Sequence, residues 1–391
     1  MKFLSNNFWS FLGLGVSLIL PSLGQVQKYL GNGSVLLYIP GVFLVLLISY
    51  KWYLKKFISK ITERQALWLI AITFIVLIIT FFIAYPIVDS GIVGGGSDRE
   101  DDINVATTNL LHGRYPYYGR TYLGNPLDHF PGILFLSSAF VLLGNSAYQN
   151  FFWICVFIFV AHAYLRDTRL VLFLFWMILF LSPVVMQEFV TGGDLISNSI
   201  YVLTFALSMV KSVSNPHAKK RTKILFAILL GIGLSSRLIY LPCLLLVFSA
   251  LVQNSGWKTA LKYIGVTCIA FLAVTATFFI YDPKNFTPFH QFKMLNQLRS
   301  PVPFSAIILS LVAGIIVLVL SFQPMQKDCL ALFRNWMILQ AILILFVVSF
   351  DTIKKGRLSF ICSGYGLSFL FFGALAFWYK LTKNKLFDKL T

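Results

Sequence analysis

Four acidic residues lie within five positions, at Asp98, Glu100, Asp101 and Asp102, directly after a long apolar run. The whole chain has 32 Lys and Arg but only 14 Asp and Glu, so this is a marked local excess of negative charge. A carboxylate at a membrane surface can take a proton from a reacting hydroxyl group. It can also simply stabilise the N-terminus of a helix. The sequence leaves both interpretations open.

The composition predicts the elements that must position these acids. Hydrophobic residues make up 58% of the chain and charged residues 12%, and the mean hydropathy is +0.80. These values are typical of membrane proteins and far from those of soluble domains. Apolar stretches of roughly the 20 residues needed to cross a bilayer recur along the chain. We therefore expect an all-α, polytopic transmembrane helical bundle, surrounded by membrane lipids and forming a single integral membrane domain over residues 1–391.

The apolar stretches predict twelve spans and their orientation. Basic loops and the basic C-terminal tail belong in the cytoplasm by the positive-inside rule, which places the acidic cluster on the extracytoplasmic side of the cell (cytoplasmic) membrane. On this topology 21 of the 32 Lys and Arg are cytoplasmic. The predicted spans are Phe8–Leu23, Val35–Tyr50, Ala66–Ile87, Gln149–Leu165, Leu170–Met186, Ile196–Val210, Ile224–Leu234, Leu238–Val252, Ala260–Tyr281, Phe304–Phe322, Leu330–Phe350 and Ser359–Tyr379.

Two places in this topology allow a second interpretation. Residues 224–252 form either a helical hairpin or one long helix, and the single helix would invert everything after it. Residues 132–143 are apolar but too short for a full crossing, so we expect an interfacial or re-entrant helix there.

Several function classes lack support in the sequence. The net charge is +18, but the basic residues lie next to apolar spans and indicate how the chain is oriented in the membrane. We therefore expect no nucleic-acid partner. The five cysteines show no CxxC or Cys/His spacing, and no Walker loop, GxGxxG or HExxH motif is present. We expect no cofactor. The clustered acids could hold a divalent metal, but a metal is not predicted.

The largest predicted outer loop covers residues 88–131. Its part DDINVATTNLLHG (101–113) has apolar residues at helical spacing, which predicts a short amphipathic helix on the membrane with the acids at its start. The stretch RYPYYG that follows is either an aromatic belt at the interface or a platform for a sugar ring. Its candidate substrate-binding residues are Arg114, Tyr115, Tyr117 and Tyr118.

At this loop the chain resembles a known family. The segments SDREDDINVATTNLLHGRYPYYG and DHFPGILFL are similar to the first extracytoplasmic loop of GT-C fold glycosyltransferases, which include polyprenyl-phosphate-sugar-dependent mannosyltransferases and oligosaccharyltransferase catalytic subunits. QEFVTGGDLISN (187–198) resembles the family's second acidic loop, and GIGLSSRLIYLPCLLL (231–246) resembles a hairpin with a cation at its outer turn. The resemblance covers residues 66–260. Two extra spans precede it (1–65), and variable spans follow it (261–391).

The resemblance implies transfer of a sugar from a polyprenyl-phosphate donor to a hydroxyl of a lipid or glycan acceptor of the cell envelope, with inversion. The implied general base is Asp98 or Asp101, with Asp102 and Glu100 behind them, and it should face a water-accessible space shared with Arg237. The negative charge that grows on the lipid phosphate needs cations, and Arg237 is the first choice. His290, Lys293 and Arg299 either bind the donor phosphate as well or are solvated charges of their loop. Further implied substrate-binding residues are Asp128, His129, Glu188 and Asp194.

Two other function classes fit a polytopic chain. A polymerase or ligase of the cell-envelope glycan pathway would rely on cationic outer loops, whereas the largest outer loop here is acidic. A secondary transporter should carry acids or broken helices near the middle of the membrane, whereas nearly all acids here fall at the ends of spans.

Overall fold

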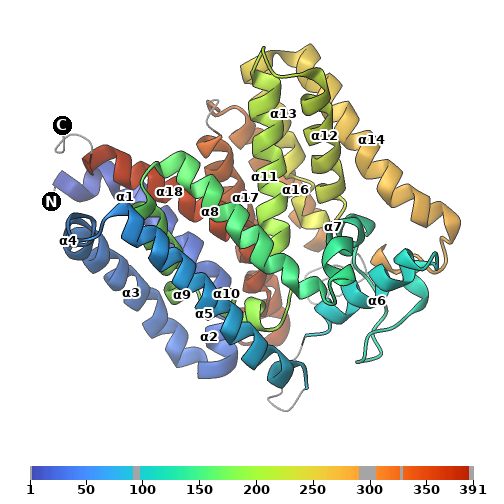
Figure 1. Cartoon of the computed structure of the whole chain (residues 1–391), viewed down its shortest axis with the longest axis horizontal. Coiled ribbons are helices and arrows are strands. Elements are labelled where there is room, and N and C mark those ends of the chain that lie inside the picture. The colour runs from blue at the N-terminus through green and yellow to red at the C-terminus, as the bar shows by residue number, and fades with distance from the viewer. Residues whose placement is uncertain (1, 91–96, 290–304, 326–328, 387–391) are drawn as a thin grey trace.

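The computed structural model describes residues 2–90, 97–289, 305–325 and 329–386 (Figure 1). Within these ranges the fold is all-α, and β pairing is limited to one isolated bridge between Arg120 and Pro126. The helices are α1 (Lys2–Ile19), α2 (Leu23–Leu30), α3 (Asn32–Ile48), α4 (Leu54–Lys60), α5 (Glu63–Asp89), α6 (Arg99–Leu111), α7 (Pro131–Leu142), α8 (Gln149–Leu165), α9 (Thr168–Leu181), α10 (Pro183–Val190), α11 (Leu195–Ser214), α12 (Lys220–Leu234), α13 (Cys243–Ser255), α14 (Trp257–Tyr281), α16 (Ser305–Ser321), α17 (Leu330–Lys355) and α18 (Leu367–Leu386).

These helices are those of a multi-pass membrane protein. Each of the twelve predicted spans falls on helical structure, but nine of the described helices are long and apolar enough to cross a membrane, or ten if the bent pair α9 and α10 counts as one span. The count of twelve therefore stays a prediction. Helix α12 has 15 residues, which at about 1.5 Å per residue is shorter than the roughly 30 Å of a hydrocarbon core.

The chain bends sharply between α9 and α10, where the sequence predicted one span. The two helices meet at an angle of 81°. Ser182 leaves the helical conformation with φ −127° and ψ 81°, and Pro183 follows at the first position of α10. A proline disfavours helical backbone in the residue before it and cannot donate a helical hydrogen bond, so the break occurs here. Because of this bend, α10 runs separately to the turn before α11.

Residues 224–252 form two helices. Helix α12 ends at Leu234 and α13 begins at Cys243, with Arg237 in extended backbone between them. Both helices pack against α11 and α14. The hairpin interpretation is therefore confirmed, and Arg237 lies at its turn.

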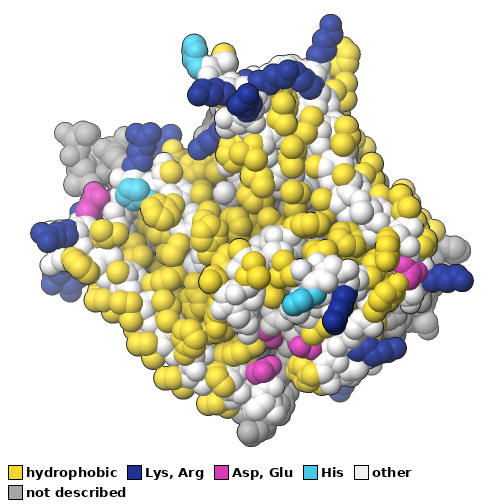
Figure 2. Space-filling view, turned by 45° about the vertical axis from the view of Figure 1, so that its right-hand side comes forward, with side chains coloured by type: hydrophobic (Ala, Val, Ile, Leu, Met, Phe, Trp, Pro, Cys, Tyr) yellow, Lys and Arg dark blue, Asp and Glu magenta, His cyan; other side chains and the backbone are white. Residues whose placement is uncertain are grey.

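The two ends of the bundle differ in charge. Loops predicted to share one side of the membrane lie together, since Arg169 Nη1 donates a hydrogen bond of 3.0 Å to the carbonyl of Ile58. Figure 2 shows hydrophobic side chains across the face, the densest group of Lys and Arg at its upper edge with others at the left and lower right, and Asp and Glu mainly in the lower half. The acidic helix α6 and its neighbour α7 lie at the lower right end in Figure 1.

Helices α6 and α7 pack together at this end and form the predicted outer-loop structure. Ile103 and Ala106 on one face of α6 are fully buried, as the helical spacing predicted, although α6 begins at Arg99 rather than at residue 101. Helix α7 coincides with the predicted short helix at 132–143 and packs on α12 and α14. The loop is thereby fixed to the bundle.

Candidate functional site

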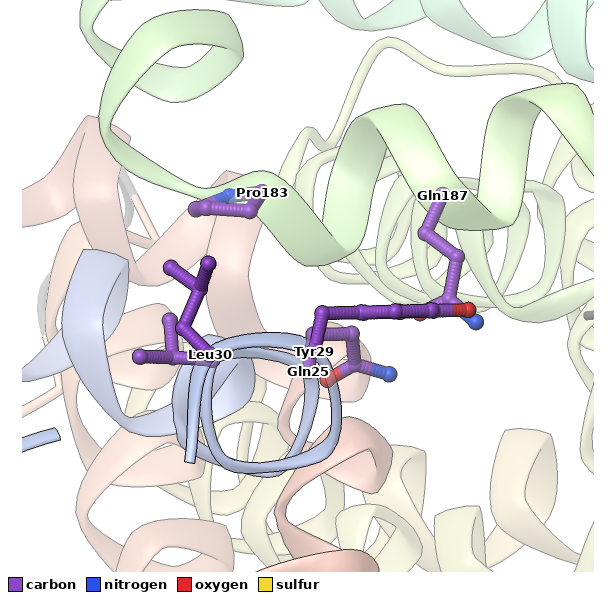
Figure 3. A pocket seen from close by; sticks show the side chains of 6 residues that line it. Gln25, Tyr29, Leu30, Pro183 and Gln187 are labelled. Atoms are coloured by element: carbon purple, nitrogen blue, oxygen red, sulfur yellow. The ribbon is translucent and has the colours of Figure 1, made fainter. Parts of the chain in front are cut away.

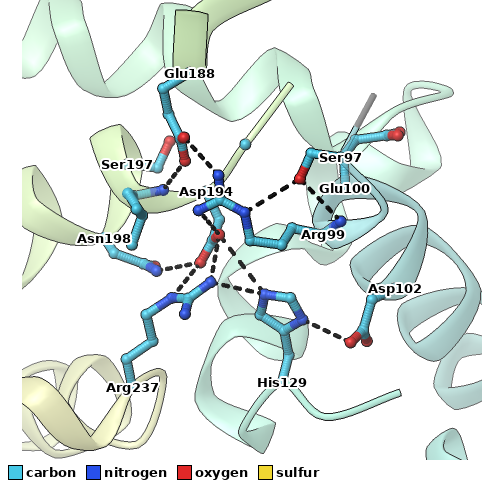
Figure 4. Close-up of polar contacts among 12 residues, drawn as sticks. Ser97, Arg99, Glu100, Asp102, His129, Glu188, Asp194, Ser197, Asn198 and Arg237 are labelled. Carbon is cyan, nitrogen blue, oxygen red and sulfur yellow. Dashed lines mark hydrogen bonds and ion pairs between the residues drawn. The ribbon is translucent and has the colours of Figure 1, made fainter. Parts of the chain in front are cut away.

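Six charged side chains from five segments of the chain meet in one place, and we refer to them as the charge cluster (Figure 4). They come from α6, from the loop before α7, from α10, from the turn before α11 and from the turn after α12. Its members are Arg99, Asp102, His129, Glu188, Asp194 and Arg237.

Asp194 is the centre of the charge cluster. Arg237 donates from Nε to its Oδ2 at 2.7 Å and from Nη2 to its Oδ1 at 2.6 Å, and Asn198 donates to Oδ2 as well. Burial opposes the charged carboxylate, but Arg237 and His129 outweigh it and hold the pKa of Asp194 well below its usual range. Such a bidentate pair is strong, and removing one partner would leave a buried charge uncompensated.

His129 lies between Asp102 and Arg237. Its Nδ1 is 2.9 Å from Asp102 Oδ2, and its Nε2 is 3.6 Å from Asp194 Oδ1 and 2.9 Å from Arg237 Nη2. Burial opposes the charged imidazolium, but the two carboxylates outweigh it and raise the pKa of His129 to about 10. Tyr117 supports the arrangement by donating its hydroxyl to the backbone carbonyl of His129 at 3.0 Å.

Arg99 and Glu188 form the outer part of the charge cluster. Arg99 Nη2 is 2.7 Å from Glu188 Oε2, its Nη1 is 4.0 Å from Asp194 Oδ1, and 32% of its side chain is exposed. Glu188 Oε1 accepts a hydrogen bond from the backbone of Leu195. A side chain at Gly193 would collide with the Glu188 carboxylate, so the glycine makes room for it. Our sequence analysis did not identify Arg99, because only its pairing with a residue 89 positions away reveals it.

Two of the four clustered acids hold a turn. Asp98 Oδ2 accepts hydrogen bonds from Thr121 Oγ1 at 2.8 Å and from Asn125 Nδ2 at 2.7 Å. Asp101 Oδ2 accepts one from the backbone N–H of Tyr122 at 2.7 Å. Both carboxylates thus fix the segment 120–126 onto α6, outside the charge cluster.

The other two acids are buried in different surroundings. Asp102 belongs to the charge cluster; its Oδ2 accepts from the backbone of Asp128 at 2.8 Å, while its buried Oδ1 has no hydrogen-bond partner among the described residues. Glu100 faces Asn104 and Tyr85 instead, and burial raises its pKa to about 7. Of the predicted base candidates, Asp102 is the one that lies in the charge cluster with Arg237, with His129 between them.

The tyrosines predicted as a sugar platform separate into two groups. Tyr115 and Tyr117 are buried in a small core with Ile103 and Phe286, so their rings pack against protein. Tyr118 is exposed and donates its hydroxyl to Asp282 at 3.0 Å. The ring of Tyr118 is therefore the one best placed for a ligand.

Asp128 is half-buried beside the charge cluster, Arg114 is exposed after α6, and His290, Lys293 and Arg299 fall outside the described residues.

His129 lies between Asp102 and Arg237 and contacts both, so the expected open space shared by the base and Arg237 stays a prediction. One apolar cavity of about 230 Å³ lies elsewhere, between the outer turns of α2 and α10 (Figure 3). It is lined by Gln25, Val26, Tyr29, Leu30, Pro183 and Gln187.

A metal would have few suitable ligands here. Asp102, Asp128 and His129 offer atoms within 4.8 Å of one another. The two carboxylates favour the imidazolium form of His129, however, so a metal would have to displace a proton before this ring could bind it. The expectation of a reaction without metal stays a prediction.

Comparison of the chain with protein-family models, with curated proteins and with solved structures gives no match.

Proposed function

We propose that this protein is a membrane glycosyltransferase of GT-C type, which moves a sugar from a polyprenyl-phosphate donor to an acceptor hydroxyl on the extracytoplasmic face of the cytoplasmic membrane. One observation carries the proposal: Asp102 Oδ1 is buried and has no hydrogen-bond partner among the described residues, in a cluster that also holds two arginines. A buried unpaired carboxylate oxygen is costly unless a ligand or water completes its hydrogen bonding.

In the proposed reaction Asp102 is the general base. The acceptor oxygen attacks the anomeric carbon and its proton passes to Asp102 Oδ1, while the bond from that carbon to the phosphate oxygen breaks and its electron pair leaves with the lipid phosphate. His129 and the backbone N–H of Asp128 hold Oδ2, so the free oxygen keeps one orientation. The arginines oppose the negative charge that grows on the phosphate.

The experiment is a transfer assay with the purified protein in proteoliposomes. Labelled polyprenyl-phosphate mannose and polyprenyl-phosphate glucose are offered with extracted envelope lipids and glycans as acceptors. We expect Asp102→Asn to lower the rate by about 10²-fold to 10⁴-fold, the usual contribution of a general base. Glu63→Gln is the control, since it also neutralises a carboxylate, one that is exposed at the start of α5 and accepts from Thr168 rather than from the charge cluster, and it should keep full activity.

The same assay tests the other base candidates. Asp98→Asn and Asp101→Asn should reduce the rate less than Asp102→Asn, because these acids hold the segment 120–126. Loss of transfer in either of them, with Asp102→Asn fully active, would contradict the assignment of the base. Absence of transfer from every donor by the wild type would contradict the enzyme class.

A secondary transporter is the second candidate, favoured by the broken helix pair α9 and α10. Transporters bind substrates at such breaks near the middle of the membrane. Uptake of a sugar or sugar phosphate into the proteoliposomes, driven by an ion gradient and without any glycosyl transfer, would support it over the transferase.

A further inference from the structure

We propose that Arg99 is the residue that receives the phosphate of the lipid-linked donor, by exchanging its ion pair with Glu188 for one with the phosphate. This inference rests on the proposed function and adds to it which cation of the charge cluster binds the substrate. The sequence analysis placed Arg237 in that role.

Exposure separates the three cations of the charge cluster. The side chain of Arg99 is 32% exposed, whereas those of Arg237 and His129 are 9% and 2% exposed. A ligand that arrives from outside therefore meets the guanidinium of Arg99 first.

The bonds of Arg237 make it a poor partner for a phosphate. Its Nε and Nη2 both donate to Asp194, which is fully buried. If the guanidinium turned toward a ligand, the buried carboxylate of Asp194 would lose its main counter-charge. Breaking a buried pair in this way costs about 3 to 5 kcal/mol. The Nη1 atom of Arg237 has no hydrogen-bond partner among the described residues, so this is the one nitrogen that Arg237 can offer a ligand without breaking a bond to Asp194 or its contact with His129.

Arg99 is held far less tightly. It makes one short contact with Glu188, its Nη1 lies 4.0 Å from Asp194, and its Nε donates to Ser97 Oγ at 3.2 Å. If Arg99 moves away, Asp194 keeps both hydrogen bonds from Arg237. A phosphate offers the same bidentate geometry as a carboxylate, so the guanidinium can exchange one for the other.

The exchange takes the counter-charge of Arg99 away from Glu188, whereas Asp194 keeps that of Arg237. Glu188 Oε1 keeps the hydrogen bond from the backbone of Leu195, but the charge of Glu188 is then buried and close to the incoming anion. Glu188 therefore opposes phosphate binding, and its removal should favour it. A purely structural Arg99, which only fixed α6 to α10, would give no such effect.

The experiment measures binding rather than transfer. Geranyl phosphate and geraniol, which differ only in the phosphate, are titrated by calorimetry into the purified full-length protein. We expect the wild type to bind geranyl phosphate more tightly than geraniol. Arg99→Gln should lower the affinity for geranyl phosphate about tenfold or more and leave the affinity for geraniol unchanged, as expected for the loss of a charge-assisted pair. The affinity of Arg99→Lys for geranyl phosphate should lie between those of the wild type and Arg99→Gln.

Two further variants complete the test. Glu188→Gln should bind geranyl phosphate several-fold more tightly than the wild type, because it removes the competing carboxylate. Arg357 is an exposed arginine near the end of α2. Arg357→Gln removes the same charge as Arg99→Gln from the same end of the molecule, and it should bind geranyl phosphate as the wild type does.

Each other outcome overturns a different claim. Equal geranyl phosphate affinity in Arg99→Gln and the wild type, or weaker affinity in Glu188→Gln, would overturn the role of Arg99 and leave the transferase proposal standing. A wild type that does not distinguish geranyl phosphate from geraniol would overturn the proposed lipid-phosphate donor, and the role of Arg99 with it. The geraniol affinity reports whether each variant is folded.

Discussion

At the scale of single residues, Glu100 should make the stability of the fold depend on pH. Burial raises its pKa from 4.5 to about 7. Below pH 4.5 the carboxyl is neutral in both the folded and the unfolded chain. Between pH 4.5 and about pH 7 the unfolded chain loses this proton and the folded chain keeps it, so the free energy of unfolding falls as the pH rises. The loss is on the order of 3 kcal/mol and is complete above pH 7.

The measurement is the thermal unfolding midpoint in detergent between pH 5 and pH 8, for the wild type and for Glu100→Gln. The wild type should lose more stability over this window than Glu100→Gln, which cannot ionise. Since other groups titrate as well, the difference between the two curves is the relevant quantity. Identical pH dependence in both proteins would show that Glu100 is ionised without penalty.

Residue types were easier to predict than their pairings. Asp194, Glu188 and Arg237 were candidates because their segments resemble the second acidic loop and the hairpin of GT-C glycosyltransferases, and the structure brings all three together. The pairing of Arg99 with Glu188 could not be predicted, because it depends on how α6 and α10 meet in space. The same holds for Asp102, whose place in the charge cluster depends on which face α6 turns toward His129.

At the scale of elements, Gly132 allows α7 to approach the turn that carries Arg237. Its N–H donates to the Ser235 carbonyl at 3.1 Å, and a Cβ at this position would collide with the carbonyl oxygen of Ile232 and lie 2.9 Å from that of Ser235. We expect Gly132→Ala to cost about 1 to 3 kcal/mol, as overpacking usually does, and to lower the unfolding midpoint.

The matched control is Gly265→Ala in α14, where an added Cβ meets nothing within 4 Å. This change should leave the midpoint unchanged or raise it slightly, because alanine favours helices over glycine. Transfer activity should fall in Gly132→Ala alone, since the displaced turn carries Arg237. Equal midpoints for the two variants would show that α7 does not approach the turn so closely.

Helices were predictable from apolar runs, whereas their breaks required particular residues. Pro183 and Pro242 mark the bend after α9 and the start of α13, and both could have been read from the sequence. The 81° angle could not, because neighbouring helices set the direction that a chain takes after a break. This angle decides where Glu188 lies.

At the scale of the whole molecule, the proposed function requires the charge cluster to face the extracytoplasmic side. The loops rich in Lys and Arg lie at the opposite end from α6 and α7, as Figure 1 and Figure 2 show for the loop before α12. The positive-inside rule predicts that this end is cytoplasmic. A polyprenyl-phosphate donor presented on the outer face could then reach the charge cluster without crossing the membrane.

Cysteine labelling tests this orientation. In a variant whose five native cysteines are replaced by alanine, Leu123→Cys places a thiol in the exposed turn after α6, and His217→Cys places one in the exposed loop before α12. On intact cells a membrane-impermeant maleimide should label Leu123→Cys within minutes, whereas His217→Cys should react only after permeabilisation. The reverse pattern would place Asp102 and Arg237 in the cytoplasm, where an acceptor on the outer surface could not reach them, and the proposed reaction would have to be abandoned even if both residues proved essential.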